Sequence, residues 1–301
     1  MEIQEILRPQ VAAYLPQRPT DGHKGCFGRV LVIAGSRTMC GAGFLCAKSA
    51  LTAGAGLVYW ALPQTMQPHF APVLPEVITL PLPETPEGEI AVSALPVLQA
   101  FVEEQKISLV VIGPGMGAGS AVRSFLFRFS AQLPCVVDAG ALGQLQKEDL
   151  AAVDFSRCIL TPHGGEMAHL LRTTPAVSGQ ERSEQVVELA LLTRAVALLK
   201  GAGTLICAGQ TIYRNTTGNC ALAKGGSGDV LSGLIAGLWA QWGLVGGFSA
   251  EAALKAALCA VYLHGLAGDL AAAERSAYAV LAQDIIAYLP KAFLAVQKGK
   301  R

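Results

Sequence analysis

Short apolar runs that end in glycine alternate with Ala/Leu-rich stretches along most of the chain. The runs are rich in Val, Ile and Leu, as buried strands are, whereas the stretches that follow them have the composition of helices. The strands that this pattern predicts lie at 28–36, 57–62, 109–117, 135–142, 158–166, 195–203 and 204–209. The predicted helices lie at 41–54, 227–241, 250–272 and 278–289.

Strands that are apolar throughout, rather than at alternate positions, are typical of a parallel sheet covered by helices on both faces. We therefore predict an α/β fold, a three-layer α/β/α arrangement with a mostly parallel central sheet. No linker divides residues 1–301, and the Pro-rich stretch 81–96 is expected to be a loop within the same unit. We expect a single domain in which 1–21 is a short N-terminal leader.

Composition narrows the classes of partner. Of the 301 residues, 52% are hydrophobic and 15% are charged, so the chain can bury a large core. Its 23 Lys and Arg nearly balance its 22 Asp and Glu, which argues against a nucleic-acid partner. The longest charge-free stretch, Val230 to Phe248, contains five glycines and starts on a Gly-rich loop. A buried core helix followed by a loop explains it better than a membrane span, which needs about 20 apolar residues.

The cysteines and the N-terminus indicate the compartment. None of the eight cysteines forms a Cys-x-x-Cys pair, and most lie in apolar runs, which is typical of buried thiols in a reducing environment. The N-terminal MEIQEILRPQ lacks the apolar run of a secretory signal. We expect a cytoplasmic protein.

The glycine-rich turns fall at the carboxyl ends of predicted strands, where parallel sheets bind their ligands. The strongest is Asn219-Cys-Ala-Leu-Ala-Lys-Gly-Gly-Ser-Gly-Asp229, which leads directly into a helix. Free N–H groups and the positive end of the helix dipole meet there, so Gly226, Ser227 and Gly228 form a candidate phosphate site. Asp229 follows in the first helical turn. Phosphate would repel it, so a base for a substrate hydroxyl or an indirect magnesium contact suits it better than phosphate binding. A helix-capping Asp is the structural alternative.

Three further turns carry candidate chemistry. His163, in Thr161-Pro-His-Gly-Gly-Glu166, is favoured as a substrate contact, although Glu166 could simply complement a helix dipole. Gly115 and Gly117, in Gly113-Pro-Gly-Met-Gly117, let the backbone approach a ligand, but such glycines often only turn the chain. The segment Lys200-Gly-Ala-Gly-Thr204 could clamp a nucleotide or form a plain hairpin turn. Asp138, at the end of another strand, could contact a ligand or hydrated magnesium.

These motifs, in this order, resemble those of the ADP/ATP-dependent NAD(P)H-hydrate dehydratases, a branch of the ribokinase-like superfamily. The resemblance runs through nearly the whole chain. Its motifs are HKGCFGRVLVIAGS (23–36), Gly41-Ala42-Gly43, GAGLV (54–58), GPGMG (113–117), VVDAGAL (136–142), LTPHGGE (160–166), LLKGAGT (198–204), NTTGNCALAKGGSGDVLSG (215–233) and AVYLHGLAGD (260–269).

The resemblance implies a ribokinase-like fold and a specific reaction. ADP or ATP, with Mg²⁺, would phosphorylate the ring hydroxyl of the S-epimer of NADH or NADPH hydrate, and phosphate would then leave as the ring double bond forms. It also implies a homo-oligomer, with a tetramer as one candidate. Some members of the family carry an epimerase domain ahead of this one, and we expect here a separate NAD(P)H-hydrate epimerase as partner.

The resemblance also implies roles for single residues. Asp229 would activate the hydroxyl, and the N–H groups of Gly226, Ser227 and Gly228 would stabilise the transferring phosphoryl group. Besides Asp229, the hydrated dinucleotide would contact Ala42, Gly115, Gly117 and His163. The nucleotide would be held by Lys200, Gly201, Ala202, Gly203, Thr204 and Gly228.

Two departures and three alternatives accompany this interpretation. Gly140 stands where the family often has Asp, and Lys224 stands where Thr is also frequent. A ribokinase-like kinase of a small alcohol or vitamin precursor would share the phosphate site and Asp229. A non-catalytic nucleotide-binding regulator would bind without turnover. A dehydrogenase is disfavoured, because no Gly-x-Gly-x-x-Gly follows the first strand with an acidic residue about 20 positions on.

Overall fold

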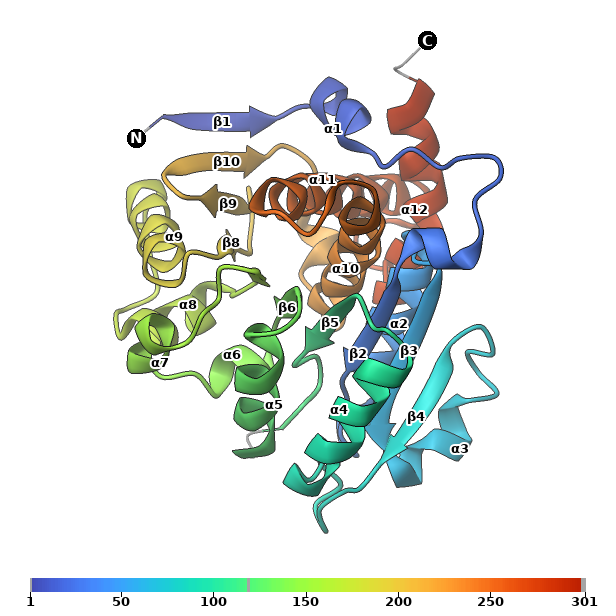
Figure 1. Cartoon of the computed structure of the whole chain (residues 1–301). Coiled ribbons are helices and arrows are strands. Elements are labelled where there is room, and N and C mark those ends of the chain that lie inside the picture. Colours follow the sequence, from blue (N-terminus) through green and yellow to red (C-terminus); the bar gives the residue numbers. More distant parts are fainter. Residues whose placement is uncertain (1, 118–119, 299–301) are drawn as a thin grey trace.

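A ten-stranded sheet runs through the molecule and separates two layers of helices (Figure 1). The computed structural model describes residues 2–117 and 120–298. The strand order is β1-β10-β9-β8-β7-β6-β5-β2-β3-β4. The strands are β1 (Ile3–Ile6), β2 (Arg29–Ile33), β3 (Leu57–Pro63), β4 (Ile78–Leu82), β5 (Leu109–Ile112), β6 (Cys135–Val137), β7 (Cys158–Leu160), β8 (Val196–Leu199), β9 (Leu205–Ala208) and β10 (Thr211–Asn215).

Neighbouring strands are parallel except where β9 pairs with β8 and with β10, which confirms the prediction of a mostly parallel sheet. The helices are α1 (Arg8–Tyr14), α2 (Cys40–Thr52), α3 (Gln67–Phe70), α4 (Leu95–Glu104), α5 (Ser120–Ser130), α6 (Gly140–Gly143), α7 (Lys147–Ala152), α8 (Gly164–Leu171), α9 (Gly179–Thr193), α10 (Ser227–Gly246), α11 (Ala250–Arg275) and α12 (Ala282–Gln297).

Alternate side chains of the central strands enter two separate cores. Val30 and Val32 of β2 pack on the side of α2, α10, α11 and α12, whereas Leu31 and Ile33 pack on the side of α4 to α9. All four side chains are fully buried. This burial on both faces is why the strand sequence is apolar throughout, and it gives the three layers that the sequence predicts.

Helices α2 and α10 pack against each other through glycines. A Cβ at Gly233 of α10 would lie 2.0 Å from the Cys46 carbonyl oxygen of α2, and one at Gly237 would lie 2.4 Å from the Ala50 carbonyl oxygen. The missing side chains therefore let the two helix backbones touch. The charge-free stretch that starts at Val230 is accordingly a buried core helix, as predicted.

Only α11 among the described helices is long and apolar enough, by length and composition, to cross a membrane. In its most apolar window, 72% of the residues are buried inside the protein. These residues pack between α10 and α12, so the helix has the environment of a core helix.

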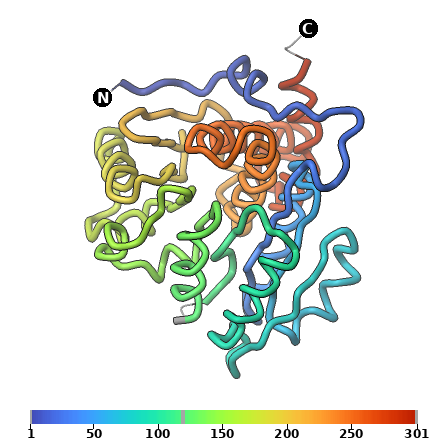
Figure 2. Tube along the Cα trace, viewed as in Figure 1, coloured from blue at the N-terminus to red at the C-terminus, as the bar shows by residue number. Residues whose placement is uncertain are grey.

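The edges of the sheet differ from the expectation. β1 lies in the segment predicted as a leader, and it pairs in parallel with β10, about 200 residues away along the chain, as Figure 2 shows. The predicted loop at 81–96 is shorter, because β4 extends into it to Leu82 and α4 starts at Leu95. The last helix runs to Gln297 instead of ending at 289, with Pro290 inside it.

Candidate active site

Three neighbouring strands place polar side chains just beyond their carboxyl ends, on one side of the sheet. Asp138 follows β6, His163 follows β7 and Lys200 follows β8, and these strands are adjacent in the sheet. The backbones of His163 and Lys200 form an isolated parallel bridge just beyond the strand ends. The order of the strands therefore brings together residues that are 25 and 37 positions apart in the sequence.

The N-terminus of α10 points toward these strand ends. Gly226 precedes the helix with a φ of 90°, and a Cβ there would lie 2.6 Å from Leu45 Cδ1, so glycine is required. The Ser227 amide donates to the Lys224 carbonyl at 3.3 Å, so it is not free for the phosphoryl contact predicted for it. The Val230 amide donates to the Gly226 carbonyl, which leaves the Gly228 and Asp229 amides at the open helix end. A Cβ built at Gly228 would lie 3.5 Å from Lys200 Nζ, so the ammonium group stands beside these amides.

His264 of α11 contacts the first residue of this helix, Ser227. Its Nε2 lies 3.0 Å from the Ser227 carbonyl oxygen and 3.3 Å from Ser227 Oγ. Burial lowers the pKa of His264 to about 4, so the imidazole is neutral near pH 7 and can donate to the carbonyl. Sequence reasoning gave His264 no role. The only signal was its place in AVYLHGLAGD (260–269), a polar residue in a mostly apolar stretch.

Asp138 and Lys200 form a buried ion pair. Asp138 Oδ1 accepts from Lys200 Nζ at 2.6 Å and from Thr161 Oγ1 at 2.8 Å, and Oδ2 accepts from Ser232 Oγ at 2.7 Å. Burial acts to raise the pKa of Asp138, but the Lys200 charge and these hydrogen bonds outweigh it, so the pKa is lowered. Lys200 Nζ also lies 3.8 Å from Glu166 Oε2. Burial acts to lower its pKa, but the two carboxylates prevail and the pKa is raised.

Asp229 has the opposite environment. It is the third residue of α10, and among the described residues no side chain donates a hydrogen bond to it. It does not cap the helix, because that position belongs to Gly226. Burial and then the Asp138 charge raise the pKa of Asp229 to about 6, with Lys200 opposing them. A carboxylate with this pKa can accept a proton near neutral pH.

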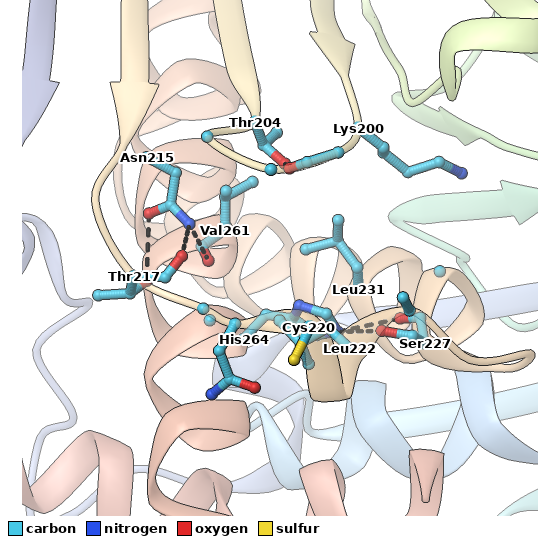
Figure 3. A pocket seen from close by; sticks show the side chains of 18 of the residues that line it. Lys200, Thr204, Asn215, Thr217, Cys220, Leu222, Ser227, Leu231, Val261 and His264 are labelled. Carbon is cyan, nitrogen blue, oxygen red and sulfur yellow. Dashed lines mark hydrogen bonds between the residues drawn. The ribbon is translucent and has the colours of Figure 1, made fainter. Parts of the chain in front are cut away.

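A pocket of about 800 Å³ opens beside these groups. Its lining includes His163, the whole turn from Lys200 to Thr204, Ser227 and Gly228. Figure 3 shows Lys200 and Thr204 on one side of the space, with Ser227 and Cys220 across from them. Its volume falls within the range of small-molecule sites. The nucleotide-binding residues predicted from sequence therefore surround one cavity, although their contact with a nucleotide stays a prediction.

The turn from Lys200 to Thr204 also forms the hairpin that the sequence offered as the alternative to a nucleotide clamp. Leu199 and Leu205 pair across the antiparallel strands β8 and β9, and the five residues between them make the connection. Gly201 has a φ of 141° and Gly203 one of 58°. The hairpin and the pocket wall are thus the same backbone.

His163 and Glu166 start α8 in a reciprocal cap. The Gly165 and Glu166 amides donate to His163 Nδ1, and the His163 amide donates to Glu166 Oε2 at 2.8 Å. Glu166 therefore acts at the start of the helix, as the sequence-based alternative expected, here as part of the cap. The His163 side chain is 59% exposed and lines the pocket, so a bound substrate can reach it, as its predicted role requires.

The other predicted substrate residues form a separate group. A Cβ at Gly115 would lie 2.7 Å from Ala42 Cβ, so these two residues touch, while one at Gly117 would lie inside the Glu89 carboxylate. None of the three lines the pocket around Lys200. Gly115 lets the backbone at Met39 pack closely and Gly117 leaves room for the Glu89 side chain, while their contact with a dinucleotide stays a prediction.

The described residues do not form a protein cage for magnesium. They contain no cluster of three His, Cys, Asp or Glu side chains that could hold a metal ion. Both oxygens of Asp138 already accept hydrogen bonds, and the residue is 1% exposed. Direct coordination by Asp138 does not fit, and the contact through water stays a prediction. Magnesium usually enters such sites on the nucleotide phosphates.

Comparison with known proteins gives the family. The sequence model of Carb_kinase, described as NAD(P)H-hydrate dehydratase, matches residues 30–291. The chain belongs to this family. The bifunctional NAD(P)H-hydrate repair enzyme Nnr of Moorella thermoacetica is 44% identical over 284 residues, which are 92% of this chain and 51% of that protein. The ADP-dependent (S)-NAD(P)H-hydrate dehydratase of Bacillus subtilis is 32% identical over 93% of this chain and 94% of its own.

A solved structure of the family supports the fold. The ADP/ATP-dependent NAD(P)H-hydrate dehydratase from Bacillus subtilis, co-crystallised with ATP and Mg²⁺, superposes with a TM-score of 0.78 at 29% identity. The match covers 98% of this chain and 99% of that one. The resemblance seen in the sequence and the ribokinase-like fold are thereby confirmed. The chain spans about half the length of the bifunctional relatives of this family.

Proposed function

We propose that this protein uses ADP or ATP to dehydrate the S-epimer of NADH or NADPH hydrate and so restores NADH or NADPH. One observation carries the proposal: the open end of α10, with Lys200 beside it, stands next to a carboxylate whose pKa is raised to about 6. The helix end and Lys200 suit the phosphates of a nucleotide. Asp229 suits the removal of a proton from a hydroxyl. The family membership favours a hydrated nicotinamide over a sugar as the owner of that hydroxyl.

The reaction has two balanced steps. Asp229 takes the proton of the ring hydroxyl while the hydroxyl oxygen attacks the terminal phosphorus of the nucleotide. The bond between that phosphorus and the rest of the nucleotide breaks. The Gly228 and Asp229 amides and Lys200 stabilise the charge on the transferring group. Phosphate then leaves with the electrons of the carbon–oxygen bond, the neighbouring ring carbon gives up a proton to water, and the electrons of that carbon–hydrogen bond form the ring double bond. Hydroxide is a poor leaving group and phosphate a good one, which explains why a dehydration uses a nucleotide.

The test is an absorbance assay. Purified protein with NADH hydrate, ADP or ATP, and Mg²⁺ should restore the absorbance of the reduced ring. Omission of the nucleotide and the Asp229→Asn variant serve as controls, and both should leave the absorbance flat. Turnover of a small alcohol to its phosphate, with no recovery of the hydrate, would contradict the proposal and select the kinase.

Three further parts of the proposal concern the setting of the enzyme. Large apolar side chains such as Val245 and Tyr278 are exposed, which supports a homo-oligomer, with a tetramer as one candidate. Relatives twice as long are called bifunctional, which supports a partner enzyme that acts on the same damaged cofactor, an epimerase. All eight cysteines are free thiols, which supports the cytoplasm.

A further inference from the structure

One wall of the pocket is a loop that carries no regular structure over most of its length. Residues 215–225 supply nine of the lining positions, from the end of β10 to the glycines before α10. Among the described residues, this loop crosses α11 through a continuous series of contacts. Asn215 Nδ2 donates to the Val261 carbonyl at 3.4 Å, and Thr217 Oγ1 donates to the Tyr262 carbonyl at 2.8 Å (Figure 3 labels Asn215, Thr217 and Val261).

Two glycines of α11 allow this close approach. A Cβ at Gly265 would lie 2.3 Å from Thr217 Oγ1, and one at Gly268 would lie 2.6 Å from Leu222 Cδ2. A side chain at Gly265 would collide with the loop backbone at Thr217, and one at Gly268 would displace the Leu222 side chain. The surface of α11 is therefore shaped to fit this loop.

Asp269, one residue beyond Gly268, fastens the loop at its turning point. Its Oδ2 accepts from the Gly218 amide at 2.8 Å, and its Oδ1 accepts from Asn219 Nδ2 at 2.7 Å. Gly218 has a φ of 99°, a conformation that leaves its amide pointing at the helix. Asn219 Oδ1 in turn accepts from the Ala221 amide and starts the short helical turn at Cys220–Leu222.

The same helix also holds the phosphate end of the pocket. His264 contacts Ser227, and Asp269 lies five residues further on, about 7.5 Å along the helix axis. One rigid element thus sets the distance between the two parts of the cavity. Backbone hydrogen bonds hold the loop within itself from Asn219 to Lys224, whereas side chains hold it to α11, and Asp269 makes two of those contacts.

We infer that Asp269 is a positioning residue for nucleotide binding: its carboxylate holds the 217–222 loop against α11 and so fixes the wall of the pocket opposite Lys200. The inference rests on the proposed function, because it takes the pocket to be the nucleotide site. Asp269 touches no reacting atom. Its loss should therefore raise the Kd and KM for the nucleotide and leave kcat at saturating nucleotide nearly unchanged.

The test exploits a reciprocal exchange. In Asp269→Asn, the new amide can still accept from the Gly218 amide, but its nitrogen faces Asn219 Nδ2, donor against donor. We expect the Kd for ADP to rise about five- to tenfold by calorimetry. The double variant D269N/N219D restores a donor–acceptor pair and keeps the Ala221 contact, so it should return the Kd to within about twofold of the wild type.

A matched control comes from the same helix. Glu274 of α11 accepts from Tyr288 Oη and Lys291 Nζ, away from the loop, so Glu274→Gln should leave the Kd for ADP unchanged. In the hydrate assay, Asp269→Asn should raise the KM for ADP by the same factor as the Kd and change kcat less than twofold.

The outcomes separate this inference from the proposed function. A wild-type protein that binds neither ADP nor ATP would overturn both. A wild type that binds ADP, with Asp269→Asn equal to it or the exchange variant as weak as Asp269→Asn, would overturn this inference alone. Should Asp269→Asn lose its melting transition, the exchange variant decides: wild-type affinity supports the inference and weakened affinity overturns it.

Discussion

The regions around Asp138 and Asp229 give a carboxyl group opposite environments and shift its pKa in opposite directions. Asp138 is buried, accepts hydrogen bonds from Lys200, Thr161 and Ser232, and has a lowered pKa because these partners outweigh its burial. Asp229 is partly buried, has no such donor among the described residues, and has a pKa raised to about 6 by burial and by the Asp138 charge. Both lie at the same edge of the sheet.

The difference indicates a division of labour. A carboxylate that stays ionised and holds a cation serves as a fixed charge, whereas one that titrates near neutral pH serves as a base. Asp138 keeps Lys200 in place, and its charge makes Asp229 a stronger base. Two aspartates with equal environments could not serve both purposes.

The sharpest way to test the role of Asp229 is Asp229→Asn. Removal of the base should lower turnover at least about 100-fold, because proton abstraction is lost. The Kd for ADP should change little, since the helix amides and Lys200 remain. Steady-state assays and calorimetry measure the two quantities. A variant that keeps more than a tenth of the wild-type turnover would show that Asp229 is not the base.

Breaking the Asp138 region should affect folding as well as nucleotide binding. Lys200→Met leaves the Asp138 carboxylate buried without a cation, so the free energy of unfolding should fall by about 3 kcal/mol. Urea denaturation measures this change. The double variant Lys200→Met/Asp138→Asn should regain most of the stability but not the affinity for ADP. Equal stabilities of the wild type and Lys200→Met would contradict the ion pair.

The pH profile tests the raised pKa of Asp229. Because the base must be ionised, kcat/KM should fall below about pH 6 and reach about a tenth of its plateau at pH 5. A raised pKa also means that the charged carboxylate opposes folding above pH 6. Asp229→Asn should therefore raise the Tm at pH 8 more than at pH 4. A kcat/KM that stays flat down to pH 5 would rule out a base with this pKa.

The smallest expected effect comes from Ser232→Ala. It removes one of the three donors to Asp138, so the free energy of unfolding should fall by about 1 kcal/mol, and kcat/KM by about two- to threefold. Ser130→Ala is the matched control. Ser130 is equally buried, but its hydroxyl has no hydrogen-bond partner among the described residues, so its loss should cost less. Equal losses in both variants would show that the Ser232 hydroxyl does not support Asp138.

The fold could be predicted where its strands are buried on both faces. All seven predicted strands form. Six are shorter than the predicted runs, and β3 is one residue longer. The missed strands β1, β4 and β10 lie at or near the edges, where exposed positions interrupt the apolar pattern. A pattern search for continuous apolar runs cannot find such strands, because one face of an edge strand meets solvent.

The candidate site could be predicted in part for a similar reason. Glycine turns mark the carboxyl ends of strands, and strand order then gathered His163, Lys200 and Gly228 around one pocket. The support from His264 and Asp269 was missed, because both lie on a helix whose approach to the loop depends on packing. The sequence also did not show that Asp138 pairs with Lys200 rather than directly with magnesium, because these two residues lie 62 positions apart and meet only in the folded sheet.

The sequence by itself determined the mostly parallel sheet, the glycine turns at its edge and the presence of an aspartate at the start of α10. These depend on local pattern and on neighbours in the chain. Only the tertiary structure decided which aspartate is held ionised and which can take a proton. Lys200 and Ser232 lie 62 and 94 residues from Asp138 along the chain, and the pKa of a carboxylate depends on distance and burial in space.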